Sequence, residues 1–305
     1  MKRQLLLGLL LMTILFEVQG QQDPQYTQYM YNMNVINPAY AGSRENLSLG
    51  LLYRSQWTGL DGAPTTGTLF GHSPLGSNVG LGLSVITDEI GPVRETNAYA
   101  DVSYTLKFAG EHRLAFGIKA GATFHDRSLN TGVTVLQPGD PFFSQDITEV
   151  TPNIGAGLFY YTNKYYLSFS IPNMLEAVHL ENDNGLALGN ETQHYFLTGG
   201  YVFDLSPNTE LKPSFMLKSA FNAPTSYDIN LNARFYKKFE IGASYRESGA
   251  ISGLVNFAIT PNIRVGYAYD ATTSEIRAFA PSSHEVFLLF DLNFPKKVSR
   301  SPRYF

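Results

Sequence analysis

Residues 228–235 read DINLNARF, and this stretch decides the fold class. Its polar residues alternate with four apolar ones, Ile229, Leu231, Ala233 and Phe235. Successive side chains of a β-strand point to opposite faces, so the alternation predicts a strand with one apolar and one polar face. The same period of two returns in many other segments, among them 98–108, 114–124, 211–217, 239–245 and 286–294. Residues 47–294 are therefore predicted to form an all-β domain.

The charge content of the chain is low for a soluble domain. Of the 305 residues, 16% are charged and 13% are aromatic, whereas soluble domains carry about 25% charged residues. The chain has no Cys, which excludes disulfides and cysteine-ligated metals. The net charge of -4 argues against a nucleic-acid partner, because such a partner requires a basic surface. A mean hydropathy of -0.12 is too polar for a bundle of transmembrane helices.

The first 20 residues have the pattern of a cleaved secretory signal. Lys2 and Arg3 precede a mainly apolar run from Leu5 to Phe16, and Gly20 stands at the position before the predicted cleavage site. A basic start, a short apolar core and small residues before the site define such signals. The apolar run is too short for a membrane-spanning helix, which needs about 20 apolar residues.

The connections between the predicted strands favour a transmembrane barrel over a soluble β-sandwich. Compact turns alternate with longer polar linkers along about fourteen predicted strands, as in bacterial outer-membrane barrels. A sandwich would need charged outer faces, and this chain has few charges. Residues 286–294 form an apolar row with an aromatic end, as the last strand of such barrels does. We therefore predict an antiparallel β-barrel in contact with outer-membrane lipid, with both chain ends in the periplasm.

Two segments lie outside the predicted barrel. Residues 21–46 are rich in Tyr, Asn and Gln and are predicted to form either a plug inside the barrel or a periplasmic docking segment. Residues 295–305 form a short basic tail, which is predicted to be periplasmic. The candidate partner-binding residues come from these two segments: Tyr26, Tyr29, Tyr31, Asn37, Pro38, Tyr40, Arg300, Arg303, Tyr304 and Phe305.

Catalytic and metal-binding signatures are missing from the sequence. No two histidines have the spacing of a helical metal site, and no nucleophile elbow or phosphate-binding loop occurs in its required context. The nearest approach to a hydrolase site is His284 with Ser282 and Ser283. We expect His284 and Glu285 to make contacts in the lumen or at its rim. No catalytic residue, cofactor or metal is therefore predicted, and the protein is not expected to be an enzyme.

Several blocks of sequence resemble one family of membrane proteins. Residues 22–42 read QDPQYTQYMYNMNVINPAYAG, residues 53–66 read YRSQWTGLDGAPTT, and residues 266–276 read GYAYDATTSEI. These blocks, with the region from Gly199 to Lys218, are similar to the PorP/SprF family of outer-membrane proteins of type IX secretion and gliding motility. The resemblance covers essentially the whole chain after the signal.

The resemblance implies a non-enzymatic component of the secretion machinery. Its members divide between two roles. One is a scaffold for the periplasmic ring and motor, with a ring lipoprotein, a periplasmic ring subunit and a peptidoglycan-binding lipoprotein as partners. The other is a partner for secreting and anchoring a large surface adhesin through the C-terminal domain of that adhesin. The resemblance transfers no catalytic residues.

Two other functions remain open at the level of sequence. The first is a passive outer-membrane transport channel resembling hatch-containing fatty-acid transporters, in which residues 21–46 would be the hatch. The second is an embedded hydrolase built on His284. Solute flux would distinguish the first function from a scaffold, and the surroundings of His284 would test the second.

Overall fold

The computed structural model describes residues 25–44, 46–128, 146–175, 178–181, 187–190, 193–220 and 223–293. The predicted signal (1–20) and tail (295–305) lie outside these ranges, as do Arg300, Arg303, Tyr304 and Phe305. Strands dominate the described residues: β1 (Asn46–Ser55), β2 (Thr65–Leu75), β3 (Val79–Ile90), β4 (Val93–Lys107), β5 (Arg113–Arg127), β6 (Ile147–Tyr161), β7 (Tyr165–Ile171), β8 (Val178–Glu181) and β9 (Ala187–Asn190).

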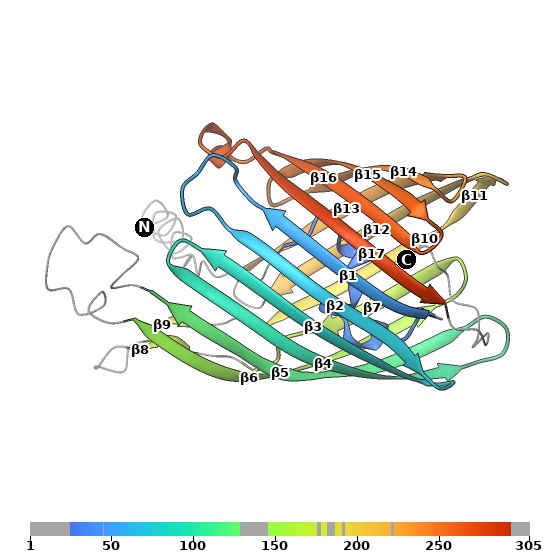
Figure 1. Ribbon diagram of the computed structural model, residues 1–305, viewed down its shortest axis with the longest axis horizontal. Helices are drawn as coiled ribbons and strands as arrows, with labels where there is room; N and C mark the ends of the chain where they lie inside the picture. The colour runs from blue at the N-terminus through green and yellow to red at the C-terminus, as the bar shows by residue number, and fades with distance from the viewer. Residues whose placement is uncertain are drawn as a thin grey trace, which may run out of the picture.

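The second half of the chain continues the same pattern (Figure 1). Its strands are β10 (His194–Tyr201), β11 (Phe203–Ser206), β12 (Thr209–Ala220), β13 (Ala223–Phe235), β14 (Phe239–Arg246), β15 (Ala250–Thr260), β16 (Ile263–Thr272) and β17 (Ser282–Asn293). Helical turns are short: η1 (Tyr29–Tyr31), α2 (Met33–Ile36), η2 (Pro38–Tyr40) and η4 (Glu275–Ala278). Within the described ranges, no helix combines the length and apolar character needed to cross a membrane.

Antiparallel pairing closes the sheet into a barrel. Strands β1 to β7 pair in chain order, as do β11 to β17; β1 pairs with β17, and β10 pairs with both β7 and β12. The result is a closed barrel of fourteen strands, with β11 as one extra short strand along β12. Strands β8 and β9 form a separate hairpin between β7 and β10. The prediction of an antiparallel barrel of about fourteen strands is confirmed.

The burial pattern is inverted relative to that of a soluble protein, and this excludes the sandwich. On β3, Leu83 is 67% exposed while Ser84 is 2% exposed. On β5, Ile118 is 66% exposed while Lys119 is 2% exposed. Apolar side chains therefore face outward and polar ones face the lumen, which is stable only where lipid surrounds the wall. Closure also pairs the backbone groups that lipid could not solvate.

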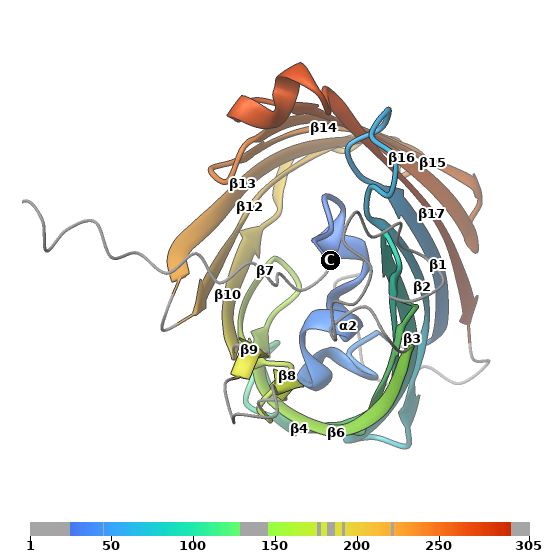
Figure 2. The same ribbon diagram turned by 90° about the vertical axis from the view of Figure 1, so that its left-hand side faces the viewer.

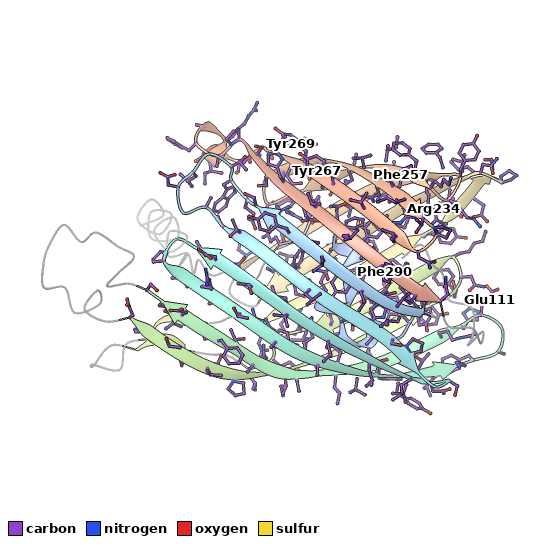
Figure 3. All side chains as sticks on the ribbon, in the orientation of Figure 1. Glu111, Arg234, Phe257, Tyr267, Tyr269 and Phe290 are labelled. Atoms are coloured by element: carbon purple, nitrogen blue, oxygen red, sulfur yellow. The ribbon has the colours of Figure 1, made fainter. Side chains whose placement is uncertain are left out.

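The two ends of the barrel differ in their connections. We call the end where β1 begins and β17 ends the turn end, and the opposite end the loop end. Connections at the turn end are short, such as 76–78, 207–208 and 261–262. The loop end carries the 56–64 loop and the 172–193 connection that contains the β8–β9 hairpin. Outward-facing aromatic residues lie toward both ends, as the labelled Tyr267, Tyr269, Phe257 and Phe290 illustrate (Figure 3).

The first prediction concerns orientation in the membrane. Because outer-membrane barrels have short periplasmic turns, we expect the turn end to face the periplasm. The chain lacks cysteine, so a single introduced thiol is the only site that a maleimide can label. The Asp61→Cys variant places this thiol at the loop end, and the Asn208→Cys variant places it at the turn end. A membrane-impermeant maleimide added to intact cells should label position 61 at the loop end, and position 208 at the turn end only after permeabilisation. The reverse labelling order would mean the opposite orientation.

Candidate functional site

Residues 25–44, which we call the inner segment, lie inside the barrel (Figure 2). The segment consists of the short turns η1, α2 and η2. Its side chains are almost all buried, and Tyr29, Gln28, Asn32 and Asn37 have no measurable exposure. The surrounding wall carries both polar side chains and buried apolar ones such as Phe70, Phe159 and Phe287, so the segment contacts it through hydrogen bonds, ion pairs and apolar packing. This interface is the candidate functional site.

The inner segment runs the full height of the lumen. Tyr26 donates from its hydroxyl to, or accepts a hydrogen bond from, Thr68 (2.9 Å), which lies near the loop end of β2. Arg44 pairs with Asp291 (3.3 Å), which lies near the turn end of β17. The segment therefore descends from the loop end to the turn end, and β1 then returns in the opposite direction.

At the loop end, the wall holds the segment through five buried charged residues. We call this set the ion network; it comprises Arg54, Asp228, Arg246, Asp270 and Glu285. The Arg54 guanidinium lies 2.8 Å from a carboxylate oxygen of Asp270 and 3.2 Å from one of Glu285. Arg246 pairs with Asp228 at 2.9 Å. Pairing of this kind is what makes buried charge tolerable.

The inner segment completes this ion network. Three carboxylates face two guanidinium groups, which leaves one negative charge in excess. The carboxylate of Glu285 accepts hydrogen bonds from the backbone N–H groups of Thr27 and Gln28, each at 2.8 Å. Arg246 in turn donates to the carbonyl oxygen of Tyr26 at 3.0 Å. Backbone donors and acceptors of the segment thus satisfy wall charges that the wall alone leaves incompletely paired.

Further contacts continue down the lumen. The Nζ of Lys119 donates to the carbonyl oxygen of Val35 (2.6 Å), and the side chain of Asn34 donates to Asp101 (3.1 Å). The hydroxyl of Tyr31 donates to Glu240. Asn230 donates to the hydroxyl oxygen of Tyr29 at 3.0 Å.

At the turn end, the segment packs against glycines of the wall. An added Cβ on Gly117 would lie 2.1 Å from the backbone nitrogen of Ala39, and one on Gly157 would lie 2.0 Å from Oδ1 of Asn37. Asn37 occupies this space to cap η2, because its Oδ1 accepts from the N–H of Ala39 (2.8 Å). Its amide nitrogen donates to the hydroxyl of Ser168 (2.6 Å). The Asn37–Pro38 turn thus fits against the wall because Gly117 and Gly157 have no side chains there.

Six of the ten predicted partner-binding residues are among those described, and all belong to the inner segment. Tyr26, Tyr29, Asn37, Pro38 and Tyr40 are buried, and Tyr31 is half-buried. They contact the barrel wall, so a separate protein could reach them only after the segment had left the lumen. Their role in partner binding stays a prediction. The ion network was not predicted from the sequence, although its charged residues stand on the polar faces of predicted strands.

The surroundings of His284 give no hydrolase geometry. His284 and Ser283 are neighbours on β17 and so point to opposite faces of the wall. The ring Nδ1 of His284 makes a hydrogen bond with the hydroxyl of Tyr267 at 2.7 Å, while the Ser282 hydroxyl contacts that of Thr58 at 2.7 Å. Glu285 faces the lumen, whereas His284 faces outward near the loop end of β17, where it contacts Tyr267. Among the described residues, no group of three or more His, Asp or Glu side chains could hold a metal ion.

Comparison with known protein families shows the family to which the chain belongs. A family model described as the type IX secretion system membrane protein PorP/SprF matches residues 18–290. The chain belongs to the PorP/SprF family. It is therefore a membrane component of type IX secretion, and its barrel fold is that of an outer-membrane protein. A search of the curated proteins found no match.

Several solved structures share the barrel of this PorP/SprF protein. The CymD monoaromatic hydrocarbon channel has a TM-score of 0.52 at 14% identity, over 86% of this chain and 92% of the channel. The Ralstonia pickettii toluene transporter TbuX has a TM-score of 0.52 at 12% identity, over 86% and 93%. The P. putida toluene transporter TodX has a TM-score of 0.50 at 11% identity, over 87% and 95%. At these identities the likeness shows the fold alone.

The second prediction concerns the loop-end contacts. Replacing Glu285 with Gln removes the carboxylate that accepts from Arg54 and from two backbone N–H groups, and hydrogen bonds to a charged group contribute about 1.5–3 kcal/mol each. Hydrogen exchange at the amides of Thr27 and Gln28 should therefore become much faster. Glu89→Gln is the matched control, because Glu89 forms an exposed ion pair with Arg94 that contributes little. Equal exchange in both variants would contradict the role given to Glu285.

The third prediction concerns the turn-end contacts. Gly157→Val places methyl groups where Asn37 lies, so we expect a loss of about 1–3 kcal/mol in stability from overpacking. Arg44 should then become accessible to trypsin in the folded barrel. Gly253→Val on β15 is the control, because no atom lies within 4 Å of its added Cβ. Unchanged protection of Arg44 in the Gly157 variant would show that the Asn37 contact does not hold the segment.

Proposed function

We propose that this PorP/SprF protein is a non-enzymatic component of type IX secretion in the outer membrane. It acts as a scaffold for the periplasmic ring and motor, or as the partner through which a surface adhesin is secreted and anchored. The observation that carries the proposal is the family match over residues 18–290. The candidate partners are a ring lipoprotein, a periplasmic ring subunit, a peptidoglycan-binding lipoprotein and the C-terminal domain of an adhesin.

The filled lumen supports a scaffold more than an open pore. Residues 25–44 occupy the lumen from one end to the other, and their contacts with buried charges on β1, β14, β16 and β17 are specific. A barrel filled in this way presents a rigid wall and two fixed ends to other proteins. We further propose that residues 21–46 act as a plug, and that the N-terminal domain boundary lies near residue 46.

A transport function is the second candidate. Its support is the shared fold with proteins described as a monoaromatic hydrocarbon channel and as toluene transporters, together with a lumen segment that could serve as a hatch. In this case the segment would have to move to open a path. The lumen holds a buried apolar and aromatic cluster that includes Phe70, Phe159 and Phe287, but the inner segment packs against it, so an apolar solute would have to displace the segment.

The fourth prediction tests the scaffold role. The basic tail (295–305) follows the strand that ends at the turn end, so we expect it to contribute to binding of the ring proteins. Deleting the tail should reduce co-purification of the ring lipoprotein and ring subunit at least about tenfold, because several charged contacts are lost together. Replacing Lys296, Lys297, Arg300 and Arg303 with Gln should have most of the same effect. Resistance of the barrel to extraction by urea should not change.

Different outcomes separate the two candidate functions. Unchanged co-purification after deletion of the tail and, separately, of residues 21–46 would contradict the docking role of both segments. Toluene flux into liposomes that increases when residues 25–44 are deleted, combined with no binding to ring proteins or adhesin domains, would favour the transport function. Binding without flux in the intact protein is the result expected for the scaffold.

A further inference from the structure

The two ends of the barrel carry opposite charge. At the loop end, acidic residues outnumber basic ones: Asp61, Asp88, Glu89, Glu95, Asp126, Asp146, Glu149, Glu247 and Glu275 against Arg94, Arg127, Lys218 and Arg277. At the turn end the balance is reversed: Arg44, Lys107, Arg113, Lys164, Arg234, Lys237, Lys238 and Arg264 against Glu111, Asp204, Glu210 and Asp291. Arg234 and Glu111 mark the turn end in Figure 3. The overall charge of -4 conceals this separation.

The excess positive charge at the turn end is concentrated at one turn. Asp204 is paired with Lys164 (2.5 Å), and Glu210 is paired with Arg234. Lys237 and Lys238 lie side by side in the connection between β13 and β14, both exposed. Among the described residues, neither lysine forms an ion pair. Tyr236 precedes them and is 71% exposed.

The backbone holds this turn in an uncommon conformation. Tyr236 and Lys237 have φ values of 52° and 56°, a region that usually requires Gly or Asn. Backbone hydrogen bonds connect this turn to the adjacent turn and to β15. The N–H of Tyr236 donates to the carbonyl of Asn208 (2.7 Å), and the N–H of Ala258 donates to the carbonyl of Lys238 (2.8 Å). Left-handed residues other than glycine cost free energy and occur most often where side chains are needed for function.

Lipid headgroups explain this turn less well than a protein does. The aromatic contact with the membrane interface is already supplied by the pair Phe235–Phe239, whose rings lie 6.5 Å apart at the strand ends. The turn extends beyond that pair, away from the strands. Tyr and basic residues that are exposed on a rigid support are typical of protein-binding surfaces.

We propose that the turn Tyr236–Lys237–Lys238 is a docking site for an acidic protein surface on the turn side of the membrane. The proposal rests on the proposed function and specifies which face of the barrel meets a partner. Complementary charge accelerates association and selects the partner, and the exposed tyrosine supplies contact area. An anionic partner also fits the charge separation, because the acidic loop end repels it.

The test uses the full mature chain in nanodiscs of phosphatidylethanolamine. The probes are the lipid-free ring lipoprotein, the periplasmic ring subunit and the adhesin C-terminal domain from the same organism. Lys237→Glu/Lys238→Glu should weaken binding at least about tenfold in 50 mM salt and much less in 500 mM salt, because salt screens exposed charges. Tyr236→Ala should weaken binding at both salt concentrations. Lys107→Glu/Arg277→Glu changes the net charge equally at other sites and should leave binding unchanged.

The possible outcomes are distinct. Equal binding by wild type and the Lys237/Lys238 variant overturns the docking site while the proposed function stands. Binding of wild type to none of the three probes overturns both. If the variant binds the probes normally but loses a thermal stabilisation that wild type gains from added phosphatidylglycerol, the turn is a lipid anchor and the docking site is wrong. Equal loss of binding in the Lys107/Arg277 control means that net charge, not this turn, is responsible.

Discussion

The rest of the structure depends on the need to keep polar groups away from lipid. Each strand places apolar side chains on one face and polar side chains on the other, and the apolar row meets the membrane. Backbone groups at an open sheet edge could not be solvated there, so β1 must pair with β17 and the wall must close. Closure turns every polar face inward. The lumen therefore gathers the charges that a soluble protein would show to water.

The inner segment resolves the problem that closure creates. Buried carboxylates and guanidinium groups are stable only when each is paired, and the wall by itself leaves Glu285 without enough donors. Thr27 and Gln28 supply two backbone N–H groups to it. Lower in the lumen, Gly117 and Gly157 leave room for the Asn37–Pro38 turn. Wall and segment are therefore two halves of one core, in which buried hydrogen bonds and ion pairs lie beside an apolar and aromatic cluster.

The strands of the barrel wall could be predicted from the sequence because apolar and polar residues alternate along each strand. Alternation such as that of 228–235 identifies strands, and low charge together with compact turns that alternate with longer linkers favours a membrane barrel. The position of the inner segment was left open between plug and docking segment, because its polar composition suits either place. Its contacts could not be predicted from the sequence for a further reason. The residues in contact are far apart in the chain: Thr27 and Glu285 are separated by 258 residues. Even His284 and Glu285, adjacent in sequence, lie on opposite faces, so one interpretation could not fit both.

The path of the inner segment makes the two ends of the lumen different. Residue 44 is tethered through residue 46 to the start of β1 at the turn end, whereas residue 26 lies at the loop end. Withdrawal that starts at residue 26 would therefore proceed along the segment toward its connection to β1. The contacts with Glu285 and Arg246 break first, and the capped turn on Gly157 breaks last. A pull on residue 26 from the loop side would break these sets of contacts one at a time, whereas a pull on residue 44 from the turn side would load the contacts on Gly157 first.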